Sequence, residues 1–451
     1  MTNFLAIVLC AVFYGSLVSP LPVSDVSSAG TPTSSTSDAA SPSPTVPLAS
    51  DDPNFPLWND TTTIDPQPER GTLGASILGP QNVEIDRQNP DILAPPTTDQ
   101  GTVGNAKWPF SLSKIQLNTG GWVRQQNVQQ MPIATGVNMR LEAGAIRELH
   151  WHQTAEWAYV LSVRDLEGST QITAVDQLGR NYVATVNTGD LWYFPPGIPH
   201  SLQATNDSAD GTEFLLIFPD GSFNDDDTLL LTDWLAHTPK EVIAKNFQDD
   251  ISDWNDIPGE QLYIFPGVPP PDNQQPPQSP AGEIPEPFSF PFSKVEPTQY
   301  TGGTVKIADS TTFNVSTEIA VAEITVEPGA MREMHWHPNQ NEWGFFLEGN
   351  ARVTLFAGTA IAQTFDYQPG DISYIPTGFG HYVENTGNTT LRFLEIFNSA
   401  IFQDVSLAQW LALTPPALVK QHLQLSDSTI AKFNRSKGVI VGGLGVNQPG
   451  V

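Results

Sequence analysis

The feature of this chain that most constrains its fold is an internal repeat. Four segments occur twice, in the same order along the chain. The pairs are WPFSLSK (ending at Lys114) with FSFPFSK (ending at Lys294), RLEAGAIRELHWH (140–152) with TVEPGAMREMHWH (325–337), GDLWYFPPGIPH (189–200) with GDISYIPTGFGH (370–381), and TDWLAHTP (232–239) with AQWLALTP (408–415). Four ordered matches predict a duplicated domain rather than a coincidence.

The length of 451 residues accommodates two such domains together with connecting segments. A run with nine prolines, from Pro266 to Pro287, separates the copies and predicts an extended, stiff linker. The expected order is a signal peptide (1–19), a disordered spacer rich in Ser, Thr and Pro (20–55), an extended N-terminal arm (56–105), the first domain (106–265), the linker (266–287), the second domain (288–436) and a C-terminal tail (437–451).

Short segments within each copy alternate apolar and polar residues, as in ARVTLFA (351–357), and Gly, Pro and Asn punctuate them. This pattern is typical of an all-β sandwich or barrel. Each copy then ends in a segment that is predicted to be helical, because it has the residues that typically begin a helix. In the first copy, Thr238 is the expected N-cap, Pro239 lies in the first turn and Glu241 follows three residues after the cap. The predicted fold is two tandem all-β domains, each followed by short helices.

The first nineteen residues have the pattern of a secretory leader. The apolar run from Phe4 to Val18 is too short to span a bilayer and is followed by Pro20. We therefore expect a secreted protein, extracellular or in the cell wall. The single cysteine, Cys10, lies in this leader, so the mature chain is expected to lack thiolate ligands and disulfides. Candidate glycan sites of a secreted chain are Asn59, Asn206, Asn314, Asn388 and Asn434.

Acidic residues outnumber basic ones, 49 to 20, which gives a net charge of −29. Such a surface repels nucleic acid and anionic membranes, so neither is an expected partner. High solubility or service in acid would each explain the charge. Because a small dianionic substrate would also be repelled overall, local positive charge would have to capture it.

Six of the eight histidines fall at matching places in the two copies, each set with one glutamate. A His-x-His pair on a strand points both imidazoles to one face, and a later carboxylate and third histidine would close a metal site. Three imidazoles and one carboxylate leave open positions on an octahedral ion, which suits Mn(II) or Fe(II); zinc would more often be tetrahedral. The alternative is eight residues that bind no metal. The candidate ligands are His150, His152, Glu156, His200, His335, His337, Glu342 and His381.

These residues resemble the two sequence motifs of the cupin superfamily. The first, Gly-(x5)-His-x-His-(x3–4)-Glu-(x6)-Gly, fits the second copy fully, from Gly329 to Gly349. The second, Gly-(x5)-Pro-x-Gly-(x2)-His-(x3)-Asn, fits that copy from Gly370 to Asn385. The resemblance implies two tandem cupin barrels, which are jelly-roll or double-stranded β-helix folds, with short C-terminal helices.

The first copy departs from these motifs at two points. Its third histidine follows the glutamate by 44 positions, against 39 in the second copy, so it carries five extra residues, which fall within 162–167. Ala204 stands where the second motif has asparagine. An insertion at a hairpin end would cost little, and an error in the gene product would explain it equally.

A closer resemblance, to the bicupin oxalate decarboxylases, extends over about residues 55–435, through segments such as GAIRELHWH and GDLWYFPPGIPHSLQA. It implies oxalate as the substrate, two Mn(II) ions per chain and dioxygen as co-catalyst; a homo-oligomer is left open. It also implies that Arg147 and Arg332 hold or polarise the oxalate, as a bidentate guanidinium can. Structural salt bridges are the alternative for both arginines. Glu395 would be the carboxylate near the second metal, or else a polar strand residue.

The same family carries a lid after a strand of the first copy, and the lid's glutamate, flanked by Ser and Asn, delivers the proton that makes formate. GSFNDDDTLL (221–230) occupies that place, and Asp225, shorter by one CH₂, aligns with the glutamate. A solvated acidic loop is the alternative interpretation. Because the lid separates decarboxylation from oxidation, three functions stay open. These are an oxalate decarboxylase, which we favour, an oxalate oxidase giving CO₂ and H₂O₂, and a non-catalytic metal-binding or storage bicupin.

Overall fold

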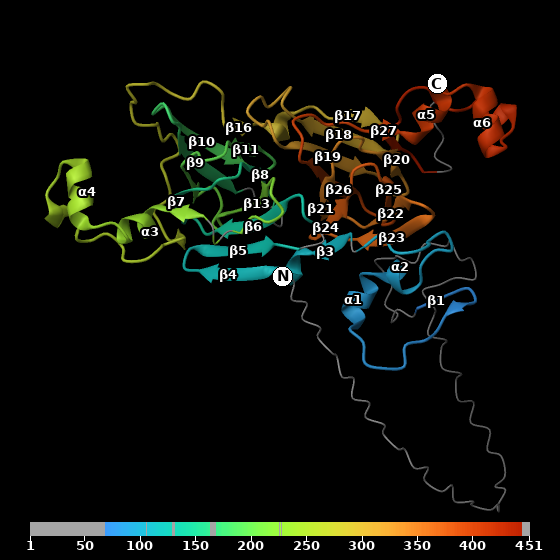
Figure 1. The fold of residues 1–451 in the computed structure, drawn as a ribbon, viewed down its shortest axis with the longest axis horizontal. Helices are drawn as coiled ribbons and strands as arrows, with labels where there is room; N and C mark the ends of the chain where they lie inside the picture. The colour runs from blue at the N-terminus through green and yellow to red at the C-terminus, as the bar shows by residue number, and fades with distance from the viewer. Residues whose placement is uncertain are drawn as a thin grey trace, which may run out of the picture. The chain divides into compact units, whose positions relative to one another are not determined.

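The computed structural model describes residues 68–104, 106–128, 131–162, 168–224, 226 and 228–443. The expected signal peptide and spacer, the start of the arm, residues 163–167 of the segment expected to hold the insertion (162–167), Asp225 and the end of the C-terminal tail lie outside these residues. Figure 1 shows the strands of the first repeat in teal and green and most strands of the second repeat in orange.

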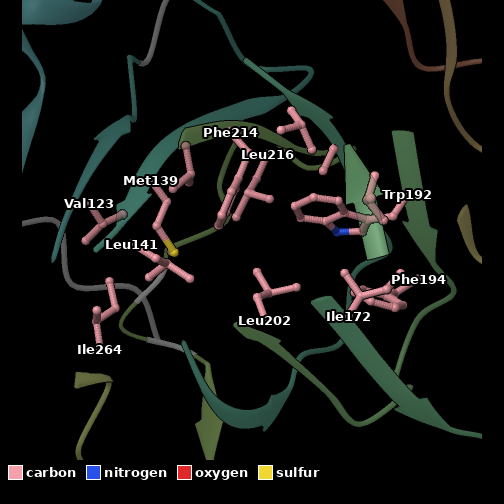
Figure 2. Packing of buried hydrophobic residues seen from close by; sticks show 14 of the residues in the cluster. Val123, Met139, Leu141, Ile172, Trp192, Phe194, Leu202, Phe214, Leu216 and Ile264 are labelled. Carbon is pink, nitrogen blue, oxygen red and sulfur yellow. The ribbon is translucent and has the colours of Figure 1, made fainter. Parts of the chain in front are cut away.

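The first repeat forms two antiparallel sheets. The larger has the strand order β16-β11-β8-β13-β6-β5-β4, and the smaller has the order β10-β9-β12-β7-β14, with β15 paired to β7. Met139, Trp192 and Leu202, which come from both sheets, meet in the buried interior (Figure 2). The bounds are β4 Lys114–Asn118, β5 Gly121–Gln126, β6 Thr135–Leu141, β7 Ile146–Trp151, β8 Glu156–Val160, β9 Ser169–Val175, β10 Asn181–Asn187, β11 Leu191–Phe194, β12 His200–Ala204, β13 Thr212–Phe218, β14 Leu229–Leu230, β15 Ile264–Phe265 and β16 Ser289–Phe290.

The second repeat repeats this arrangement. Its sheets have the orders β17-β18-β19-β26-β21-β24-β3 and β23-β22-β25-β20-β27, with β28 paired to β20. Ile324, Phe346 and Val353 lie in its interior. The duplicated all-β expectation is therefore confirmed. The bounds are β3 Lys107–Pro109, β17 Thr298–Tyr300, β18 Gly303–Ala308, β19 Ala320–Val326, β20 Met331–Trp336, β21 Glu342–Glu348, β22 Ala351–Gly358, β23 Ile361–Tyr367, β24 Asp371–Ile375, β25 Gly380–Asn385, β26 Leu391–Phe397, β27 Val405–Ser406 and β28 Ile440–Val441.

The two repeats exchange short strands. Strand β3, at the start of the first repeat, pairs with β24 of the second, and β16, at the start of the second repeat, pairs with β11 of the first. A buried cluster with residues of both larger sheets, including Trp157 and Trp343, fills the space between them. Trp343 Nε1 donates a hydrogen bond across this contact to Gln126 Oε1 at 3.1 Å. The exchange and the shared cluster join the repeats into one packed unit.

The described part of the N-terminal arm differs from the extended chain that we expected. It contains the β1–β2 hairpin (Glu69–Arg70 and Leu73–Gly74) and the short helices α1 (Val83–Arg87) and α2 (Pro90–Leu93). The side chain of Asn82 accepts a hydrogen bond from Ile85 N and caps α1, and Pro90 opens α2. Asp91 is fully buried and forms ion pairs of 2.5 Å with both Arg70 and Arg352, which fix the arm against the second barrel.

Short helices follow each barrel, as expected: α3 (Leu231–Ala236) and α4 (Lys240–Phe247) after the first, and α5 (Leu407–Leu413), α6 (Pro416–Leu423) and α7 (Asp427–Ile430) after the second. The expected N-cap, Thr238, is wrong, because α4 begins after Pro239. The hydroxyl of Thr238 instead donates to Trp234 O at 2.8 Å and closes α3. None of the helices in the described part of the chain is long and apolar enough to cross a membrane.

Candidate metal centres

The structure brings the four residues predicted for the first metal site together. His150 lies on β7, Glu156 opens β8, His200 opens β12, and His152 follows β7 by one residue. Strands β7 and β12 are neighbours, and His150 pairs directly with His200. The ligand atoms of the four side chains all lie within 4.8 Å of one another, and each residue is buried. The backbone has therefore already gathered three nitrogens and a carboxylate around one point.

Hydrogen bonds to the backbone fix the orientation of these imidazoles. The Nδ1 atoms of His150, His152 and His200 lie 2.5, 2.7 and 2.8 Å from the carbonyl oxygens of Glu148, Thr154 and Ile198. Because a carbonyl only accepts, each Nδ1 carries the proton, and each Nε2 keeps its lone pair for a metal. Outer contacts of this kind orient histidine ligands in metal sites.

The second site repeats the first. His335 lies on β20, His337 follows it by one residue, Glu342 opens β21 and His381 lies on β25. The four ligand atoms are again within 4.8 Å of one another, and all four residues are buried. The Nδ1 atoms of His335, His337 and His381 lie 2.7, 2.8 and 2.9 Å from the carbonyl oxygens of Glu333, Gln403 and Phe379.

The chemistry of both sets fits a divalent metal ion. The buried Nε2 atoms of His200, His335 and His381 have no hydrogen-bond partner in the described structure, and a bound ion would satisfy them. Burial and the charge of Arg147 hold the pKa of His150 well below its usual range, so this ligand is neutral. Burial alone would raise the pKa of Glu156, but the imidazoles of His200 and His152 outweigh it and hold that pKa well below its usual range.

Apolar rings surround the first set. Phe194 stacks on His200 with ring centroids 4.2 Å apart. Phe218 and Phe223 lie against His152 at 5.2 and 5.8 Å, and they stack on each other at 3.8 Å. The indole Nε1 of Trp192 donates to Glu156 Oε1 at 2.9 Å, which fixes the carboxylate that faces the imidazoles. These rings exclude water from the histidine side of the site.

The two predicted arginines are buried at matching positions but have different surroundings. Arg332 forms ion pairs with Glu395 at 3.2 Å and with Asp404 at 2.7 Å, and these carboxylates raise its pKa despite its burial. Arg332 thus forms structural salt bridges, which was the alternative to oxalate binding for this arginine. Arg147 instead lies 3.9 Å from the ring centroid of Tyr263 and donates to Tyr263 O at 3.4 Å.

Strand register identifies the residues that correspond to these carboxylates in the first repeat. Glu395 pairs with Gly344 on β21, and the matching pair is Leu216 with Ala158 on β8. In the same way, Ser406 of β27 pairs with His335 and Leu230 of β14 pairs with His150, so Thr228 is the equivalent of Asp404. The two positions that neutralise Arg332 are therefore uncharged in the first repeat.

Glu395 lies beside the second set, as the family resemblance implied. It is fully buried on β26, and its Oε2 has no hydrogen-bond partner in the described structure. Burial raises its pKa, and the nearby Glu342 adds to this effect. Arg332 therefore fixes one oxygen of this buried carboxylate and leaves the other oxygen without a hydrogen bond in the described structure.

Asp225 lies outside the described residues, but its neighbours are placed. Asp226 is 61% exposed and forms an ion pair with Lys114 at 3.2 Å. Asn224 Oδ1 accepts a hydrogen bond from Asp226 N at 3.2 Å. Asp226 is thus a solvated residue of the segment, whereas Phe223, three residues earlier, packs inward on Phe218.

Sequence reasoning missed Glu148, Tyr263 and Asp404. The sequence did contain a signal for Glu148, because a glutamate directly follows the arginine in both repeats, at Glu148 and Glu333. Tyr263 and Asp404 had none, because they contact the arginines from 116 and 72 positions along the chain.

Two β-sandwiches, each with a buried set of three histidines and one glutamate, define a duplicated metal-binding protein. The sequence pattern of the Cupin family matches residues 110–253 and 292–431. The chain is 50% identical over 386 residues to the oxalate decarboxylase of Bacillus subtilis, which covers 83% of this chain and 97% of that protein. It is 38% identical over 400 residues to a probable oxalate decarboxylase of Arthroderma benhamiae, over 86% and 96% of the two chains.

A solved structure of the Bacillus subtilis oxalate decarboxylase at pH 4.6 superimposes with a TM-score of 0.79 at 49% identity, and covers 84% of this chain and 98% of its own. The chain belongs to the cupin family and, within it, to the two-domain oxalate decarboxylases.

Proposed function

We propose that this chain is a Mn(II)-dependent enzyme that converts oxalate to formate and carbon dioxide. The observation that carries the proposal is the pair of complete ligand sets, each with a buried arginine three positions before its first histidine, in a chain 50% identical to an oxalate decarboxylase. One solved structure of that relative is described as a study of its Mn(II) centres. Six-coordinate Mn(II) accepts nitrogen and oxygen ligands and leaves room for a small anion.

Metal analysis of the purified protein is expected to find about two manganese ions per chain, one for each ligand set. Chelation should abolish oxalate consumption, and Mn(II) should restore it. Elemental analysis before and after chelation, with products quantified in the same samples, makes the test. Zinc or iron as the main metal in fully active protein would contradict the manganese assignment. Protein without bound metal would favour the storage alternative.

Residues of the first site have separable tasks in this proposal. Bound Mn(II), with dioxygen as co-catalyst, would supply the one-electron oxidation that weakens the carbon–carbon bond of oxalate. Arg147 would orient the dianion and balance its charge. Phe194 and Phe218 would keep water away from the histidine side. Asp225 would then deliver the proton that completes formate.

We propose turnover at the first site because two buried carboxylates lie beside the arginine of the second site. A dianion entering the second site would meet an arginine already paired with Glu395 and Asp404, both buried. The first repeat has Leu216 and Thr228 at those positions. Because like charges repel strongly where water is excluded, Glu395 and Asp404 oppose a dianion at the second site.

Replacing Arg147 with lysine is expected to raise KM for oxalate roughly 10- to 100-fold, the range for loss of a charge-assisted hydrogen bond. A lysine ammonium is a point charge and cannot reproduce the planar fork. Steady-state kinetics with Arg332→Lys as the matched control tests this. Equal KM increases in the two variants would contradict turnover at the first site alone.

Oxalate oxidase remains the second candidate, because Asp225 is shorter than the family's lid glutamate and Asp226 and Asp227 beside it add charge. Without a timely proton, further oxidation would give a second carbon dioxide and peroxide. Quantifying formate and peroxide on the same oxalate sample separates the two activities. Peroxide as the main product would establish the oxidase.

Three further expectations concern secretion, glycosylation and the oligomeric state of the protein. We propose secretion with glycans on some of the five sequons, and assembly into a homo-oligomer. Apolar residues exposed on the helices after each barrel, including Trp234, Phe247, Trp410 and Leu413, support a contact between copies. Light scattering of the secreted protein, before and after deglycosylation, tests both proposals.

A further inference from the structure

A buried glutamate directly follows the arginine of the first site. Glu148 is 2% exposed, and its carboxylate accepts four hydrogen bonds. Its Oε1 accepts from Thr232 N at 2.7 Å and Thr232 Oγ1 at 2.5 Å, and its Oε2 accepts from Leu262 N at 2.9 Å and Tyr263 N at 2.8 Å. This one carboxylate therefore ties helix α3 and the segment before β15 to the strand that carries His150.

The residue that Glu148 holds has an unusual backbone. Tyr263 has a φ of 57°, in the left-handed region that side chains with a Cβ rarely adopt. Its amide donates to the carboxylate of Glu148, and its carbonyl accepts from Glu148 N at 2.9 Å. Such a conformation persists only where surrounding contacts hold it in place. Here Glu148 alone bonds to both the N–H and the C=O of Tyr263.

The second repeat contains the same clamp with a different side chain. Val439 has a φ of 47°, donates to Glu333 Oε1 at 3.0 Å and accepts from Glu333 N at 2.8 Å. Val439 has no ring to place against Arg332, which is held by Glu395 and Asp404 instead. The backbone clamp is thus common to both repeats, and only the first uses it to present an aromatic ring to the arginine.

The ring of Tyr263 lies where it can control Arg147. The guanidinium carbon is 3.9 Å from the ring centroid, within the range of a cation–π contact, and both residues are buried. An aromatic face attracts a guanidinium without neutralising its charge, whereas a carboxylate partner removes net positive charge from the site. The ring can therefore fix the orientation of the Arg147 guanidinium without itself removing charge from it.

We propose that Glu148 and Tyr263 are positioning residues of the first site. Glu148 holds the backbone of Tyr263 in its left-handed conformation, and the ring of Tyr263 sets the plane of the Arg147 guanidinium for the oxalate. The proposal rests on the proposed function, because it names the first site as the one that binds this anion. It predicts a defect in binding rather than in chemistry.

The backbone clamp is tested without any activity measurement. Glutamine in place of Glu148 has nearly the same shape, but its NH₂ group cannot accept and would face N–H donors. Amide hydrogen exchange in the metal-loaded Glu148→Gln protein is expected to accelerate at Leu262 and Tyr263. The matched variant Glu333→Gln should accelerate exchange at Val439 and leave Tyr263 protected. Protection of Tyr263 that is unchanged in Glu148→Gln would overturn the clamp.

The role of the ring is tested by Tyr263→Val, which installs the side chain that the second repeat already carries at this φ. Its KM for oxalate should rise roughly tenfold, the order expected for loss of one buried cation–π contact, with a smaller change in kcat. Tyr263→Phe restores the ring and should recover most of that loss. A KM in Tyr263→Val equal to that of the wild type would overturn the ring's role, as would a fall in kcat alone. A Tyr263→Phe defect as large as that of Tyr263→Val would assign the effect to the hydroxyl and likewise overturn it.

Failure of the proposed function is visible separately. Wild-type protein loaded with Mn(II) that does not consume oxalate would refute the function, and it would also refute the kinetic role of the ring. The exchange experiment would still decide whether Glu148 clamps Tyr263. Oxalate turnover in the wild type with unchanged kinetics in every Glu148 and Tyr263 variant would refute the positioning role alone.

Discussion

Replacing Glu156 with glutamine is expected to deplete manganese from the first site and to remove most of the activity. Glu156 is the one anionic group among the four gathered side chains. The amide that replaces it carries no charge, and Trp192 Nε1, 2.9 Å from Oε1, would face either a weaker acceptor or another donor. The loss of metal affinity should exceed the roughly 10- to 100-fold that loss of an outer-shell partner costs.

The second site supplies a matched control for this prediction. Glu342→Gln should deplete the second metal by the same argument, because Glu342 faces His337 and His381 at 3.0 and 3.3 Å. Elemental analysis and spin-resonance spectra of both variants would show one ion per chain lost in each case. If turnover occurs at the first site, Glu156→Gln should lose far more activity than Glu342→Gln at equal metal loss. Full metal occupancy in either variant would contradict the ligand assignment.

Replacing Asp225 with alanine is expected to lower the formate yield sharply and to raise the share of peroxide. Proton transfer by a positioned acid is worth roughly 10²–10⁴-fold, so the change should be large. Metal content and KM for oxalate should stay near their wild-type values, because each site already gathers three histidines and one glutamate without Asp225. Quantifying formate and peroxide in the same reaction measures the ratio directly.

Two variants sharpen this test. Asp225→Glu restores the side-chain length of the family's lid residue, so it should keep or raise the formate yield. Asp226→Ala removes a carboxylate that is 61% exposed and paired with Lys114 at the surface, so its effect on the product ratio should be small. Asp227→Ala completes the series. If none of the three alanine variants changes the ratio of formate to peroxide, the lid carboxylates have no role as proton donors.

The sequence predicted the duplicated all-β fold and all eight gathered residues because both are encoded locally. Alternation along a strand decides which side chains share a face, and His-x-His followed by a glutamate places three candidate ligands within a few residues. The third histidine was found because its segment, GDLWYFPPGIPH, repeats in the second copy. Where local signals compete, the sequence was less reliable. Thr238 is a good N-cap residue, but its hydroxyl closes the preceding helix instead.

The sequence could not predict the contacts that distinguish the two sites. Arg147 and Arg332 occupy the same position of the same motif, yet one lies against the Tyr263 ring and the other between two carboxylates. Their partners come from strands and loops far along the chain, and the closure of each barrel brings them to the arginine. The exchange of β3 and β16 between the barrels likewise depends on how the larger sheets pack.

The sequence by itself therefore determined the repeat, the strands and the identity of the metal-binding side chains, because spacing along a strand fixes which residues point together. Only the tertiary structure decided what charge surrounds each arginine. That charge depends on burial and on contacts between residues 63 to 116 positions apart, such as Arg332 with Glu395 and Arg147 with Tyr263. No local pattern specifies such contacts, since they form when two sheets close around a shared interior.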